Sequence, residues 1–215
     1  MRSCGKRAIG EFMNKGFYIY IAVILCGWAA IITLNCILTH IWPWLIAVGV
    51  IGSTVVVIAI DAVCAHICHV RQSRIDPFSR FFNVSKRQKN VLTRLGIRKL
   101  KNYLPDLGVL VKFPKGRIVD PKSKEYVRTY MMESCSGEIG HIFGAFFGFL
   151  ILLIFPPWIP LFAGYWLSLT LPVALVNFVL CLLPPLALRY NRYSLAQIYL
   201  RLEAREKRNT VVSDQ

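Results

Sequence analysis

The stretch from residue 133 to residue 188 decides the fold: ESCSGEIGH (133–141) is followed by IFGAFFGFLILLIFPPWIPLFAGYWLSLTLPVALVNFVLCLLPPLAL (142–188). The second part contains no Asp, Glu, Lys, Arg or His. A transmembrane helix needs about 20 consecutive apolar residues, so this run is long enough for two. The proline-rich turn PPWIP at 156–160 divides it. We therefore predict one membrane span that begins near residue 136 and another over residues 161–188, with the prolines of the latter as break points.

Two further apolar runs lie in the first third of the chain. Residues 17–38 and 44–63 are each long enough to cross a bilayer and are joined by an uncharged turn at 39–43. The first run lacks the small-residue cleavage site of a signal peptide, so we expect it to remain as a span. Hydrophobic residues make up 55% of the chain, more than in a typical soluble domain. The sequence predicts an all-α integral membrane protein with four transmembrane helices.

The charged residues flank these apolar runs. The chain carries 26 Lys and Arg against 11 Asp and Glu, and most of the basic residues lie between positions 71 and 138. This distribution argues against nucleic-acid binding, because the basic residues do not form a patch on a soluble domain. The two turns that follow the first and third spans contain no Lys or Arg. By the positive-inside rule, we expect a multi-pass protein of the cell membrane with the basic segment and both termini in the cytoplasm.

This pattern divides the chain into four parts. They are an N-terminal transmembrane hairpin (1–70), a basic cytoplasmic and interfacial segment (71–138), a C-terminal transmembrane hairpin (139–188) and a cytoplasmic tail (189–215) whose charged helix is expected over 195–208.

The basic segment is predicted to contain an amphipathic helix at the membrane surface. Asp76-Pro77 is a helix start, with Asp as cap and Pro at the first helical position, and Gly96 is a helix end. Apolar side chains between them recur on one side, so we expect a helix over Phe78–Leu95 that binds anionic lipid headgroups. Asp120-Pro121 repeats the start signal and predicts a second helix that runs through Tyr130 towards the membrane.

The polar residues of 133–141 stand at a membrane boundary, where ionisable side chains are functional candidates. Glu138 and His141 are three residues apart and share one face of a helix. A solvated helix end explains their position equally well. Small residues at four-residue spacing follow, and they let another helix approach closely, which permits a helix-helix oligomer: Gly140, Gly144 and Gly148.

Other polar groups give weaker signals. His66 and His69 are three apart near Cys64, but their spacing matches no zinc pattern, and we predict no metal site. Asp61 is the only acidic residue inside an apolar span, so it needs a partner or water. The seven cysteines are odd in number and do not form a disulfide framework.

Three short motifs in the second half of the chain resemble those of the glycosyl-4,4'-diaponeurosporenoate acyltransferases of bacterial carotenoid biosynthesis. They are IRKLKNYLPD (97–106), Glu133-x4-Glu138-x2-His141 and RYNR (189–192), and the resemblance covers roughly residues 75–200. Ser136 stands where this family usually has Arg. The resemblance implies a membrane-bound acyltransferase that moves a fatty acyl chain onto a sugar hydroxyl of a glycosylated carotenoid or related glycolipid. It implies no cofactor, only an acyl donor such as acyl-CoA or acyl-carrier protein.

The resemblance also implies roles for individual residues. His141 would act as general base, because the ordinary pKa of imidazole, about 6.5, suits that task. Glu138 would orient it, and Glu133 belongs to the same catalytic motif. The substrate-binding residues would lie at the cytosolic interface, where the arginines could bind donor phosphates or serve only as positive-inside anchors: Lys101, Arg189, Asn191 and Arg192.

Two other functions are consistent with the sequence. Glu138-x-x-His141 matches half of a carboxylate-bridged di-iron site, although no second such motif occurs. A non-catalytic membrane scaffold or subunit, packed through its glycines, is the other alternative. Metal analysis tests the first alternative, and acyl transfer from labelled acyl-CoA tests the second.

Overall fold

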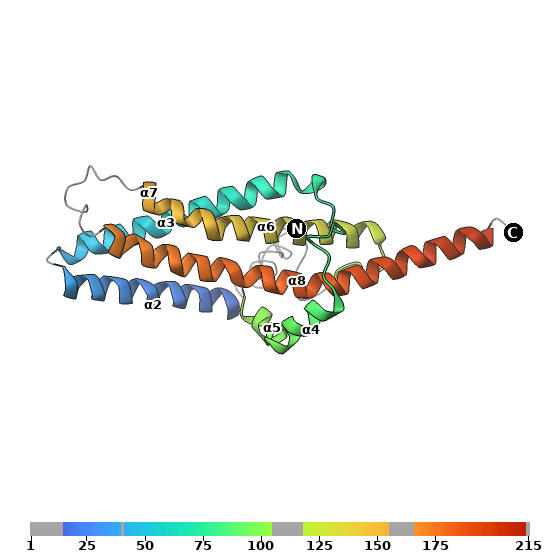
Figure 1. The fold of residues 1–215 in the computed structure, drawn as a ribbon, viewed down its shortest axis with the longest axis horizontal. Coiled ribbons are helices and arrows are strands. Elements are labelled where there is room, and N and C mark those ends of the chain that lie inside the picture. Colours follow the sequence, from blue (N-terminus) through green and yellow to red (C-terminus); the bar gives the residue numbers. More distant parts are fainter. Residues whose placement is uncertain (1–14, 40, 105–117, 155–165, 214–215) are drawn as a thin grey trace, which may run out of the picture.

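The computed structural model describes residues 15–39, 41–104, 118–154 and 166–213. These residues form helices and turns without a strand, and four of the helices are long and apolar enough to cross a membrane (Figure 1). The all-α membrane fold is thereby confirmed. The long helices are α2 (Lys15–Leu38), α3 (Pro43–Val70), α6 (Lys124–Phe147) and α8 (Trp166–Ser213). The short ones are η1 (Gln72–Arg74), α4 (Lys86–Arg94), α5 (Ile97–Leu100), η2 (Lys101–Tyr103), η4 (Gly148–Leu150) and α7 (Ile151–Ile154).

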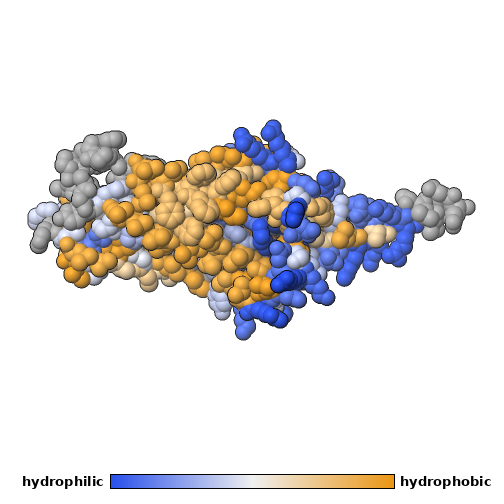
Figure 2. All heavy atoms as spheres, viewed as in Figure 1, coloured by the Kyte–Doolittle hydropathy of each residue, from blue (hydrophilic) through white to orange (hydrophobic). Residues whose placement is uncertain are grey.

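The four long helices run side by side, and α8 extends past the others at one end (Figure 1). On the face shown in Figure 2, apolar side chains cover the bundle, and polar ones gather towards the end where α8 projects. Helices α4 and α5 pack against α8 at this polar end. A membrane protein exposes apolar side chains to lipid, as Ile37 and Val55 do here. The apolar part has its own buried core, formed by Ile31, Ile46, Val50, Val57, Ile151, Leu169, Val173 and Ala174.

The helices continue past three of the predicted span boundaries, where the hydropathy changes. Helix α3 passes residue 63 and ends at Val70, and α6 begins at Lys124, well before residue 136. The predicted fourth span and the tail helix are one helix, α8. The divisions proposed after residues 138 and 188 therefore fall inside α6 and α8. A helix needs only internal hydrogen bonds, so it crosses the change from lipid to water without a break.

The prolines of α8 do not break it either. A proline lacks the N–H that would bond to the carbonyl four residues earlier, so that carbonyl needs another donor. The carbonyl of Leu180 accepts a hydrogen bond from the hydroxyl of Tyr20 at 3.1 Å, and that of Ser168 accepts one from Asn35 Nδ2 at 3.3 Å. Side chains of α2 thus replace two of the missing donors, which also fixes α2 against α8. The prolines concerned are Pro184 and Pro172, and Pro185 is the third within the helix.

The amphipathic helix at the polar end is shorter than predicted. Asp76 Oδ1 accepts a hydrogen bond from the Phe78 amide, but this bond closes a turn. The helix α4 starts ten residues later, where Ser85 Oγ accepts from the Gln88 amide and Gln88 Oε1 accepts from the Ser85 amide. This capping box gives hydrogen-bond acceptors to the backbone amides of Ser85 and Gln88. The helix therefore starts here and not at Asp76-Pro77. Gly96, with φ 74°, ends the segment as predicted.

The second start signal behaves in the same way. Asp120 Oδ1 accepts hydrogen bonds from the amides of Lys122 and Ser123 in a turn, and the hydroxyl of Ser123 then caps α6 by accepting from the Tyr126 amide. The predicted helix through Tyr130 is present, but it begins after this turn and is continuous with the third span.

The glycines of α6 and the first residue of η4, Gly148, bring helices together within the chain. A methyl group placed on each would meet a neighbouring helix: Ala65 at Gly140, Asp61 at Gly144 and Asn177 at Gly148. At Gly144 the added carbon would lie 2.5 Å from Asp61 Oδ1, too close for any side chain. Close approach is confirmed, but this face packs on α3 and α8 of the same chain. Oligomer formation through these glycines stays a prediction.

Candidate functional site

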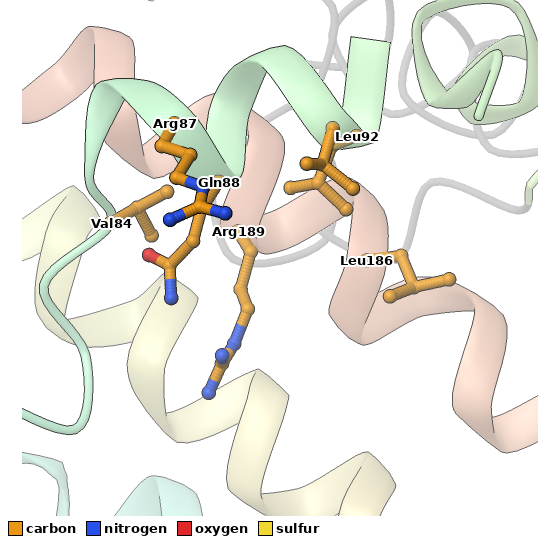
Figure 3. A pocket seen from close by; sticks show the side chains of 7 residues that line it. Val84, Arg87, Gln88, Leu92, Leu186 and Arg189 are labelled. Carbon is orange, nitrogen blue, oxygen red and sulfur yellow. The ribbon is translucent and has the colours of Figure 1, made fainter. Parts of the chain in front are cut away.

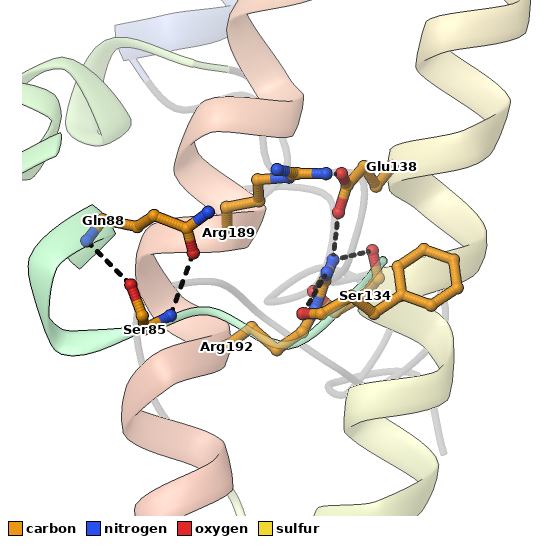
Figure 4. A network of polar contacts seen from close by, with 7 residues as sticks. Ser85, Gln88, Ser134, Glu138, Arg189 and Arg192 are labelled. Carbon is orange, nitrogen blue, oxygen red and sulfur yellow. Dashed lines mark hydrogen bonds and ion pairs between the residues drawn. The ribbon is translucent and has the colours of Figure 1, made fainter. Parts of the chain in front are cut away.

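A buried carboxylate joins α6 to α8 at the boundary between the apolar and polar parts. Glu138 is 0% exposed, and each of its two oxygens bonds to an arginine of α8 (Figure 4). Arg189 Nε lies 2.5 Å from Oε1, and Arg192 Nη2 lies 2.6 Å from Oε2. The two arginines are three residues apart, so they share a face of α8. Two cations share one anion here, which leaves a net positive charge at this level of the bundle.

Arg192 is buried, and both of its terminal nitrogens bond to the protein. Its side chain is 2% exposed, and besides Glu138 it donates to the carbonyl and the hydroxyl of Ser134 at 3.1 and 3.3 Å. Its Nη1 donates to the carbonyl of Phe82 at 3.3 Å, which ties the turn before α4 to the bundle. The predicted contact between Arg192 and a donor phosphate does not fit this burial. Arg192 instead connects α6, α8 and the turn, a role that hydropathy and charge patterns do not reveal.

Arg189 is more accessible. Its side chain is 31% exposed, and its Cζ lies 5.5 Å from the centre of the Phe81 ring. With Nε bonded to Glu138, its two terminal nitrogens remain as donors. Arg189 belongs to the lining of a cavity of about 270 Å³ between α4 and α8 (Figure 3). The whole lining consists of Val84, Arg87, Gln88, Val91, Leu92, Leu186 and Arg189.

His141 lies one turn along α6 from Glu138 and is half-buried. The two arginines of α8 bond to both oxygens of Glu138, so this carboxylate helps to fix how α6 and α8 lie against each other. Direct orientation of the imidazole by Glu138 stays a prediction. Ser136, in place of the family arginine, is buried in the same part of α6.

Glu133 lies beside His69, a histidine to which the sequence analysis assigned no chemical role. Its Oε2 lies 3.4 Å from His69 Nδ1, at the end of α3. The side chain of Glu133 is 13% exposed and that of His69 is 49% exposed, so the pair is accessible from one side. No sequence pattern links these two positions, because they come together only when α3 packs on α6. The catalytic role of Glu133 stays a prediction.

The other two predicted binding residues lie on a different side of α8. Lys101 Nζ, in η2, donates to Asn191 Oδ1 at 3.4 Å and lies 5.8 Å from the centre of the Tyr190 ring. The structure thus brings Lys101 and Asn191 together, and both are half-buried. Their contacts connect η2 to α8, and they are separate from the contacts of Glu138.

The intramembrane carboxylate has the partner that the sequence required. Asp61 Oδ2 accepts a hydrogen bond from the thiol of Cys181 in α8 at 3.4 Å. Within the described ranges, no group of three or more His, Cys, Asp and Glu residues is placed to hold a metal ion. The six cysteines that the structure describes are free thiols.

Comparison with protein families gives a match over residues 77–201 to the model described as glycosyl-4,4'-diaponeurosporenoate acyltransferase. The matched range includes α4, all of α6, about the first three quarters of α8 and the whole Glu138 cluster. Neither the curated proteins nor the solved structures gave a match.

Proposed function

The chain belongs to the glycosyl-4,4'-diaponeurosporenoate acyltransferase family, and from this premise we propose that it transfers a fatty acyl chain to a sugar hydroxyl of a glycosylated carotenoid or a related membrane glycolipid. The observation that carries the proposal is the meeting of two sequence motifs at one level of the bundle. Glu138, one turn from His141, bonds to Arg189 and Arg192 of the RYNR motif. This level lies where the apolar bundle gives way to the polar end, at which a lipid acceptor and a water-soluble donor can meet.

The chemistry needs a base and a place for the leaving group. The acceptor hydroxyl oxygen attacks the carbonyl carbon of an acyl thioester, so a C–O bond forms and the C–S bond breaks. His141 takes the proton from the hydroxyl and returns it to the leaving thiolate, which departs as a thiol. An imidazole can do both near neutral pH because both of its protonation states are accessible there.

Glu138 is assigned a positioning role. A buried carboxylate between two guanidinium groups fixes how α6 and α8 lie against each other, and His141 and Arg189 project from these two helices. Glu133 and His69 form a second carboxylate-imidazole pair at the same end of the bundle, on the α3 side of α6. We assign to this pair the relay of protons between the site and water.

The orientation in the cell membrane follows from charge. We place the polar end, with α4, α5 and the projecting part of α8, in the cytoplasm together with both termini. The basic side chains of this end then face anionic headgroups, and a glycolipid acceptor presents its sugar at the same depth. The acyl donor reaches the site from the cytoplasm.

The test is acyl transfer by the purified full-length protein in lipid nanodiscs. Labelled acyl-CoA and acyl-loaded carrier protein are offered as donors, with extracted membrane glycolipids as acceptors and lipid mass spectrometry as the readout. We expect a labelled ester on a glycosylated lipid with the wild-type protein. His66→Ala serves as a control, since His66 is exposed on α3 and has no assigned role. A wild-type protein that acylates none of these lipids would contradict the proposal and favour a scaffold.

A further inference from the structure

The cavity between α4 and α8 combines a cationic part with an apolar part. Figure 3 shows Val84, Arg87 and Gln88 on one side of Arg189, and Leu92 and Leu186 on the other. Its volume, about 270 Å³, is at the small end of ligand sites, so it can hold a segment of a ligand. The cavity is built from the capped helix α4 and from α8, both well anchored in the fold.

The charge of the cavity is not balanced by the protein. Among the described residues, no carboxylate pairs with Arg87, and Glu138 serves both Arg189 and Arg192. Counting one charge for each side chain, this group of four carries two more positive than negative charges. Unbalanced guanidinium groups in a concave site favour a ligand with phosphate oxygens, which accept their paired N–H groups.

Hydrogen bonding at the cavity supports the same ligand class. Gln88 uses its amide oxygen to bond to the Ser85 amide, so its amide nitrogen remains as a neutral donor. Arg189 has its Nε on Glu138 and keeps its terminal nitrogens. Every polar side chain that lines the cavity therefore offers a donor, and none of them is a carboxylate that would repel an anion.

We propose that this cavity binds the phosphopantetheine end of a thioester donor, with Arg87 as a phosphate-binding residue and the apolar side chains around the pantetheine arm. The inference rests on the proposed acyl transfer and adds the site at which the donor binds, with Arg87 as the residue that contacts its phosphate. The cavity reaches Arg189, which bonds to Glu138, one turn of α6 from His141. A donor held at Arg87 thus extends its flexible arm, and the thioester at its tip, towards the base. The phosphopantetheine group is shared by acyl-CoA and acyl-carrier protein.

The experiment compares Arg87→Gln with Arg94→Gln in the purified full-length protein. Both variants remove one positive charge from an exposed position of the same helix, but only Arg87 lines the cavity. We expect Arg87→Gln to raise the donor KM about tenfold or more, the scale of a lost charge-assisted hydrogen bond, with kcat nearly unchanged. Arg94→Gln should resemble the wild type. Equal effects of the two variants would overturn the proposal, because general attraction by positive charge would then explain both.

A truncated donor isolates the phosphate. The S-acyl thioester of N-acetylcysteamine carries the same reacting bond without a phosphate, so wild type and Arg87→Gln should use it equally well. A difference that persists with this donor would overturn the phosphate contact. Direct binding of coenzyme A and of unloaded holo-carrier protein gives a readout without turnover. At least one of the two should bind the wild type and bind Arg87→Gln about tenfold more weakly.

The outcomes separate this inference from acyl transfer itself. Transfer from acyl-CoA alone or from acyl-carrier protein alone supports the proposal and identifies the source of the phosphopantetheine. Transfer that uses only phospholipid acyl groups would overturn the donor class and leave the acyltransferase function standing. A wild-type protein that transfers from no donor would contradict both, and coenzyme A binding unaffected by Arg87→Gln would contradict the cavity assignment alone.

Discussion

The ion pair between Glu138 and Arg192 should be the most sensitive contact in the described part of the fold. Both side chains are almost completely excluded from water, at 0% and 2% exposure. Removing one partner leaves the other as an uncompensated buried charge, which typically costs about 3–5 kcal/mol. We expect Glu138→Leu to lower the free energy of unfolding by about 3 kcal/mol, the low end of this range, because Arg192 keeps its hydrogen bonds to Ser134 and Phe82.

A double-mutant cycle separates this pair from simple loss of packing. The double variant Glu138→Leu, Arg192→Leu leaves no fully buried charge at this position, since Arg189 is partly exposed and can turn towards water. It should therefore cost about 2–3 kcal/mol less than the sum of the single variants. Arg189→Leu serves as the matched control and should cost about 1 kcal/mol, because Glu138 keeps Arg192.

The assay is equilibrium unfolding of the purified protein in mixed micelles, followed by circular dichroism as the denaturing detergent increases. Each variant gives a free energy of unfolding relative to the wild type. Single-variant costs that simply add, within about 0.5 kcal/mol, would refute the account of Glu138 as the carboxylate that holds α6 and α8 together.

Two further predictions concern topology and packing. A cysteine introduced as Trp42→Cys should react with a membrane-impermeant thiol reagent added to intact cells, whereas Lys122→Cys should react only after lysis; external labelling at Lys122 would refute the orientation. Gly144→Ala should destabilise the bundle by about 1–3 kcal/mol, because its methyl group would lie 2.5 Å from Asp61 Oδ1. Gly27→Ala, which meets nothing within 4 Å, should be neutral or slightly stabilising, and equal melting temperatures of the two variants would show that the α3–α6 contact is looser than described.

The class of fold could be predicted from the sequence because apolar runs of about 20 residues have few other uses. The sequence also contains the signal for the start of α4, since Ser85 and Gln88 have capping-box spacing. The prediction followed the competing start signal Asp76-Pro77, which lies about ten residues earlier. The continuity of α8 could not be predicted from the sequence. It depends on Tyr20 and Asn35 of a distant helix, which supply donors to carbonyls that the prolines leave without one.

The candidate site shows the same limit. Helical spacing correctly predicts that Glu138 and His141 share a face, and charge distribution correctly places Arg189 and Arg192 near the same boundary. Neither pattern states which face of α6 meets which face of α8. The burial of Arg192 on Glu138 and the pairing of Glu133 with a histidine of α3 arise only from tertiary packing.

The central claim is that the Glu138 cluster supports acyl transfer with His141 as the base. The direct measurement is the rate of labelled ester formation on a glycosylated membrane lipid by wild type and by His141→Ala, with both proteins shown to melt at the same temperature. The account predicts a loss in kcat of about 100-fold or more in the variant, the usual scale for a positioned general base. A folded His141→Ala protein that transfers the acyl group at the wild-type rate would contradict it.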